Sequence, residues 1–148
     1  MPSPNWIAVI IAALIPMIVG FIFYHKAVFG KAWMSSLGIT EEDLKGGNMA
    51  VIFGVSLLMS LLMSMFLLGN VDGPGQEGVY DTFKHGALHG FILAVMIAMP
   101  VLVTNGLFER KNFKNLGINT LYWIITFTLM GGVLDALNHW PADMQIPG

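Results

Sequence analysis

The sequence contains no cysteine and very little charge. Of its 148 residues 11% are charged, with seven Lys plus Arg against nine Asp plus Glu and a formal net charge of −2. The absence of cysteine excludes disulfides, thiolate metal ligands and cysteine nucleophiles. A water-soluble domain usually carries about 25% charged residues, so this chain has too few to cover a soluble globule. Because the chain is not basic, nucleic acid is not an expected partner.

Long apolar runs take the place of the missing charge. The hydrophobic fraction is 55% and the mean hydropathy is +0.71. A helix needs roughly 20 predominantly apolar residues to cross the hydrocarbon core of a bilayer. Four stretches meet this requirement and contain no Lys, Arg, Asp or Glu: residues 6–24, 49–68, about 86–107 and 116–134. The sequence therefore predicts a single all-α integral membrane domain over residues 1–148, built as a bundle of four transmembrane helices.

Basic residues concentrate on one side of the predicted bundle. The connections 25–48 and 108–115 each contain three Lys or Arg residues, whereas the connection 69–85 contains only Lys84. With four spans the first and third connections share a side, and the positive-inside rule places that side in the cytoplasm. Both termini are therefore expected outside the cytoplasm, in an N-out/C-out arrangement.

The first connection is predicted to be more than a tether. Segment 29–34 mixes apolar and basic residues, as in an interfacial turn or short helix. Thr40, followed by three acidic residues, is typical of a helix N-terminus. Lys31 and Trp33 are the candidate interfacial residues for docking a partner protein or a second copy of the chain. This surface favours a non-enzymatic accessory or partner-binding subunit, embedded in a lipid bilayer, as the first functional hypothesis.

Small residues recur at helical spacing within the spans. They stand four apart in the second and third spans and side by side in the fourth: Ser56, Ser60 and Ser64; Gly86, Gly90, Ala94 and Ala98; Gly131 and Gly132. Because apolar faces gain little by meeting in lipid, close helix packing depends on small residues. These residues are expected to pack the bundle internally rather than to form a dimer interface.

Ionisable residues gather at the outer ends of the third and fourth spans. Asp81, His85 and His89 are each four residues apart, so a helix places them in one stripe, and Asp135 and His139 repeat that spacing. Folding the hairpin about residue 112 places His89 level with Asp135 and His85 level with His139. The candidate ligand residues are His85, His89, Asp135 and His139, with Asp81 and Asn138 supporting them.

Several chemistries remain open for this cluster. Imidazoles with a carboxylate are suitable ligands for a transition metal, and two imidazoles are suitable axial ligands for a haem. A His–Asp pair also suits proton-coupled transport, since imidazole titrates near neutral pH. The structural alternative is a hydrogen bond that fixes the register of the hairpin. No cofactor is required by the pattern itself.

An enzymatic role is not expected. The zinc-protease pattern needs a Glu directly after the first His, and Gly86 stands there instead. The serines of the second span have no predicted base at their depth, so a serine nucleophile is not supported. No catalytic residue is therefore assigned.

Several short segments resemble a known family. Residues 85–90 (HGALHG), 108–111 (FERK) and 119–132, which include Tyr122-Trp123 and the sequence MGG, are similar to small bacterial integral membrane proteins of domain-of-unknown-function family 1761. Segment 24–33 also resembles the first connection of that family. The resemblance implies a four-helix protein of a bacterial cytoplasmic (inner) membrane, with no established activity and no catalytic residues to transfer.

Overall fold

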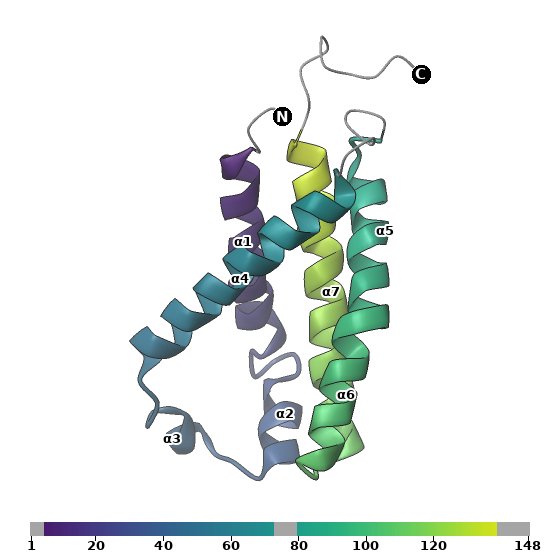
Figure 1. The fold of residues 1–148 in the computed structure, drawn as a ribbon. Helices are drawn as coiled ribbons and strands as arrows, with labels where there is room; N and C mark the ends of the chain where they lie inside the picture. Colours follow the sequence, from purple (N-terminus) through teal and green to yellow (C-terminus); the bar gives the residue numbers. More distant parts are fainter. Residues whose placement is uncertain (1–4, 73–79, 139–148) are drawn as a thin grey trace, which may run out of the picture.

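The structure, a computed structural model, describes residues 5–72 and 80–138 (Figure 1). In chain order its elements are α1 (Trp6–Phe23), α2 (Gly30–Leu37), α3 (Glu41–Leu44), α4 (Met49–Val71), α5 (Phe83–Leu93), the π-helical turn η1 (Ala94–Ala98), α6 (Met99–Phe108) and α7 (Phe113–Leu137). Within this described part, α1, α4, the continuous rod α5–η1–α6 and α7 are long and apolar enough to cross a membrane. The predicted all-α architecture with four spans is confirmed.

Each spanning helix begins at a polar cap. The cap side chain accepts a hydrogen bond from a backbone N–H of the first turn in all four cases: Asn5, Asn48, Thr82 and Asn112. Such caps satisfy donors that have no partner within the helix. Four predicted ends move outward by three residues, because these caps and the last helical turns extend past the uninterrupted apolar runs.

Helix α7 lies at the centre of the bundle and contacts α1, α2, α4, α5 and α6 (Figure 1). The beginning of α1 and the end of α7 lie together, at the end of the bundle that we call the outer end after the predicted sidedness. There the Asn5 backbone N–H donates to Oδ1 of Asn138 at 3.2 Å, and Nδ2 of Asn5 donates to the Leu137 carbonyl at 2.9 Å. The chain therefore enters the first span and leaves the last span on the same side of the bundle, as an even number of crossings requires.

Glycines bring α5 and α7 into backbone contact. A Cβ atom built on Gly86 would overlap the carbonyl oxygen of Gly131, and one built on Gly90 would overlap that of Phe127. Both glycines on α5 are buried, as is Gly131 on α7. The expectation that these small residues pack the bundle internally is confirmed.

The third span contains a π-helical turn that the sequence reading treated as regular helix. The turn covers Ala94–Ala98, and the N–H of Met99 donates to the carbonyl of Ala94, five residues back. Only Met99 separates it from Pro100, which has no N–H and whose ring would crowd the preceding turn of a regular α-helix. The wider turn relieves this conflict and shifts the helix face by one residue.

Helix α4 packs on α1 only in its outer half. Oγ of Ser64 donates to the carbonyl of Val9 at 2.8 Å, and Ser60 is also buried. Ser56, one turn nearer the inner end, is exposed, because α4 diverges from α1 there (Figure 1). The predicted serine stripe therefore packs the bundle over two of its three positions, and the expectation for Ser56 is wrong.

A chain of polar side chains fastens the first connection to α7 at the inner end. The Tyr24 hydroxyl donates to Asn119 at 2.8 Å, Nδ2 of Asn119 donates to Asn115 at 3.0 Å, and Nδ2 of Asn115 donates to Oγ of Ser36 at 3.0 Å. Burial, reinforced by a neighbouring tyrosine, raises the pKa of Tyr24 well above its ordinary value, so this hydroxyl remains a donor. Sequence reasoning did not assign this network.

The first connection folds into two short helices, as expected. In α3, the Thr40 N–H and hydroxyl both bond to Oδ2 of Asp43 at 2.7 Å, and a capping box is formed. In α2, the indole of Trp33 is half-buried and lies 5.3 Å from the ring of Tyr24. Part of the Trp33 side chain, which was predicted to dock a partner, is therefore packed inside the molecule. The other predicted docking residue, Lys31, is exposed.

The sidedness of the bundle is a prediction that reporter fusions can test. A reporter active only outside the cytoplasm is expected to work at either terminus and to fail when inserted after Glu109, between α6 and α7. The physical reason is the excess of Lys and Arg in the first and third connections. A cytoplasm-only reporter is expected to give the opposite pattern, and activity of that reporter at either terminus would reverse the assignment.

Candidate functional site

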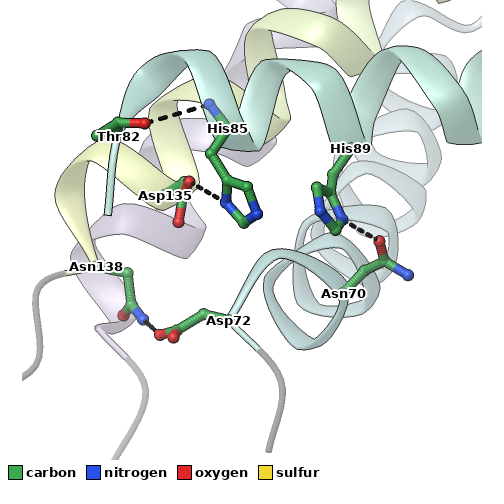
Figure 2. Close-up of polar contacts among 7 residues, drawn as sticks. All are labelled: Asn70, Asp72, Thr82, His85, His89, Asp135 and Asn138. Carbon is green, nitrogen blue, oxygen red and sulfur yellow. Dashed lines mark hydrogen bonds and ion pairs between the residues drawn. The ribbon is translucent and has the colours of Figure 1, made fainter. Parts of the chain in front are cut away.

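The first contact of the candidate site joins α5 to α7 at the outer end. Nδ1 of His85 lies 2.9 Å from Oδ2 of Asp135 (Figure 2). The Asp135 side chain is 2% exposed and that of His85 is 20% exposed. The position follows from the helix start: Thr82 caps α5 and accepts the N–H of His85 at 3.3 Å, which places His85 in the first turn. A buried carboxylate is thus paired with an imidazole that reaches the surface.

The second contact joins α5 to α4. Nδ1 of His89 lies 3.0 Å from Oδ1 of Asn70, in the last turn of α4. The ring centroids of His85 and His89 are 4.5 Å apart. Figure 2 shows both imidazoles pointing from α5 toward the ends of α4 and α7. Three helices therefore position two neighbouring imidazoles.

These contacts determine which nitrogen of each imidazole carries the proton. An ionised carboxylate and an amide oxygen only accept hydrogen bonds, so Nδ1 of His85 and Nδ1 of His89 act as donors. In a neutral imidazole the other nitrogen, Nε2, then holds the lone pair. The pair thus presents two potential metal-ligating atoms, each oriented by an oxygen from a second helix, as is common around metal-bound histidines.

Further polar contacts hold the helix ends around the pair. Nδ2 of Asn138 donates to Oδ2 of Asp72, which follows α4 (Figure 2). Oδ1 of Asn138 accepts from the N–H of Asn5 at the start of α1. Asp81 is half-buried next to Thr82, the cap of α5. The predicted supporting residue Asn138 therefore connects α1, α4 and α7 and does not contact the imidazoles directly.

The structure corrects the predicted register of the hairpin by one helical turn. His85, rather than His89, lies level with and bonds Asp135. The turn between α6 and α7 occupies residues 109–112, so the hairpin is centred nearer the N-terminus than the assumed residue 112. The π-helical turn adds one more residue to the path of the third span. His139 lies outside the described residues.

No cluster of three His, Asp or Glu side chains that could hold a metal ion occurs within residues 5–72 and 80–138. His85 and His89 supply two ligand atoms, and Asp135 is engaged with His85. Asn70 was missed by the sequence reading because the second span was ended at residue 68. The sequence did contain a signal, because a side-chain amide follows directly on the apolar run. An amide at membrane depth needs a hydrogen-bond partner, so a helix that continues to Asn70 indicates such a partner on another helix.

Fold and site together define a multi-pass α-helical membrane protein with a polar cluster at one end of its bundle. Residues 7–135 match the family described as "Protein of unknown function (DUF1761)". Because the match covers most of the chain, the protein belongs to this family, and the resemblance found in the sequence is confirmed. No curated protein and no solved structure matches the chain.

Proposed function

We propose that this chain is a non-enzymatic binding protein of a bacterial inner membrane, and that it binds a transition-metal ion between His85 and His89 at its outer end. The observation that carries the proposal is the pairing of each Nδ1 with an oxygen acceptor, on Asp135 and on Asn70. This pairing leaves two Nε2 lone pairs on adjacent turns of one helix. Imidazole nitrogens at this spacing suit Zn²⁺, Cu²⁺ or Ni²⁺.

The geometry favours a metal ion over a haem held by these two residues. A haem ligated by two imidazoles needs one ring on each face of the porphyrin. The ring centroids of His85 and His89 are only 4.5 Å apart, and both residues project from one helix. A metal ion with water or a third protein ligand in its remaining positions fits this arrangement, and His139 is the third candidate from the sequence.

A partner-binding role through the first connection is the second candidate function. Exposed Lys31 on α2 supports it, together with the firm attachment of α2 to α7 through Asn115 and Ser36. A partner that docks there would be recovered after extraction in mild detergent. Equal recovery with wild type and a Lys31→Ala variant would count against this surface.

The metal site is tested by titrating purified, metal-stripped protein in detergent with Zn²⁺, Cu²⁺ and Ni²⁺, followed by calorimetry. We expect uptake of one ion per chain with at least one of these metals. His89→Ala is expected to weaken binding at least 10-fold because it removes one ligand atom. Asn70→Ala is expected to weaken it about 10-fold, since loss of an orienting partner typically costs 10- to 100-fold. Affinity should fall on acidification, because a protonated imidazole cannot ligate.

His25→Ala provides the matched control for this experiment. His25 is exposed at the opposite end of the bundle, so its removal should leave the affinity unchanged. Circular dichroism of each variant checks that the helices are retained. The proposal is overturned if metal-stripped wild type takes up none of the three ions, or if His89→Ala binds them as tightly as wild type does.

A further inference from the structure

A lateral cleft opens between the inner halves of α1 and α4, at the end of the bundle away from the imidazoles. Its volume is about 620 Å³, within the range of about 300–1,000 Å³ typical of small-molecule sites. The lining is almost entirely apolar and comes from three spans: it includes Pro16 and Gly20 of α1, Ser56 and Met59 of α4, and Trp123 of α7. Because all three helices are candidate spans, the cleft lies at hydrocarbon depth.

The cleft extends through only one half of the bundle. On its outer side α1 and α4 are in contact, where Ser64 bonds the Val9 carbonyl and buried Leu67 packs in the same core as Ala12. On its inner side Nζ of Lys26, just after α1, forms an ion pair of 2.6 Å with Glu41 of α3. A membrane-spanning helix of a second copy cannot pass through a cleft blocked at mid-depth. An acyl chain from one leaflet ends at mid-depth and therefore fits.

Cationic side chains lie near the inner end of the cleft. Lys26 follows α1, Lys31 stands in the first turn of α2 and Lys45 is the C-cap of α3. Figure 1 shows both short helices at the inner end of the bundle. Lys26 is paired with Glu41, whereas exposed Lys31 and Lys45 form no ion pair with an acidic residue of the described segments. Two unpaired ammonium groups at this level complement the phosphate of an anionic lipid headgroup.

We propose that the cleft is a binding site for one anionic phospholipid of the leaflet on the inner side, with an acyl chain between α1, α4 and α7 and its phosphate beside Lys31 and Lys45. This site is separate from the paired imidazoles at the outer end, and it neither requires nor excludes metal binding there.

The proposal is tested by fluorescence quenching of Trp123, which lines the cleft. In the full-length chain the other tryptophans are replaced (Trp6→Phe, Trp33→Phe and Trp140→Phe), and detergent-solubilised protein is titrated with acyl-brominated phosphatidylglycerol or phosphatidylcholine. We expect saturable quenching at one lipid per chain, with half-saturation at a several-fold lower concentration for phosphatidylglycerol. Native mass spectrometry of the wild-type chain should show one retained lipid, so the result does not depend on the tryptophan substitutions.

Two matched variants separate filling of the cleft from a general change in α4. Ser56→Phe places a ring in the cleft and is expected to reduce the quenching at least two-fold. Gly54→Phe adds the same ring in the same helical turn, where a Cβ atom meets no neighbour within 4 Å, and should leave the quenching unchanged. The double variant Lys31→Ala/Lys45→Ala is expected to abolish the preference for phosphatidylglycerol.

Each other outcome overturns the proposal. Non-saturable quenching, or equal quenching in Ser56→Phe and Gly54→Phe, would show that no lipid site exists at the cleft. Equal half-saturation for the two lipids in wild type would remove the anionic headgroup from the proposal. A dimer in which Trp123 is shielded from brominated lipid would show that a second copy covers the cleft instead.

Discussion

Gly131→Leu is expected to destabilise the folded bundle by at least about 3 kcal/mol, the upper part of the range for overpacking a close contact. Gly131 faces the backbone of α5, and even a Cβ atom would overlap the carbonyl oxygen of Gly86. The obstacle is backbone rather than the end of a flexible side chain, so the two helices must separate. Unfolding by a denaturing detergent, followed by circular dichroism, measures the loss.

Gly117→Leu is the control on the same helix. Gly117 is exposed on α7, and a Cβ atom there meets nothing within 4 Å, so a leucine should cause no loss of stability. Gly131→Ala is expected to fall between the two variants. If Gly131→Leu and Gly117→Leu unfold at the same detergent fraction, the close contact between α5 and α7 is absent in the membrane protein.

His85→Ala is expected to have the second-largest effect, a loss of about 3 kcal/mol. Removing one partner of a buried pair leaves the other unpaired, which typically costs about 3–5 kcal/mol. The lower value applies because the His85 side chain is 20% exposed and solvent partly compensates. The same detergent unfolding assay measures the effect. This is also why the metal titration relies on His89→Ala, whose neutral contact with Asn70 should cost only about 1 kcal/mol.

The double variant His85→Leu/Asp135→Leu distinguishes pairing from simple loss of volume. Replacing both members of a buried pair by apolar residues is often neutral or stabilising, so most of the stability lost in His85→Ala should return. If His85→Ala is as stable as wild type, the pair does not fix the register of α5 against α7. Metal binding through Nε2 would then have to be explained without Asp135 as the orienting group.

The helices could be predicted because their signals are local. The length of an apolar run depends on consecutive residues, and caps such as Asn5 and Asn112 lie next to the helices that they start. The stripe of His85 and His89 follows from helical spacing alone. The positive-inside assignment also rests on local counts of Lys and Arg, and it stays a prediction until reporters are placed.

The register of the helices could not be predicted in the same way. It depends on the length of the turn at 109–112 and on the π-helical turn before Pro100, and each moves the contacts by a fraction of a turn or more. The pairing of His89 could not be predicted either, because the amide after the second apolar run indicates a polar contact but does not show which side chain of another helix it meets. Recognition of the family added architecture but no residue roles.

The sequence by itself therefore determined the class of protein, four apolar helices with a polar outer end, because the free energy of placing a segment in lipid depends on that segment's own composition. Only the tertiary structure decided which residues meet: His85 with Asp135, His89 with Asn70, and α4 apart from α1 at Ser56. In lipid one apolar face is nearly equivalent to another. Helix pairing then depends on close backbone approach at glycines and on a few interhelical hydrogen bonds, which are properties of the assembled bundle.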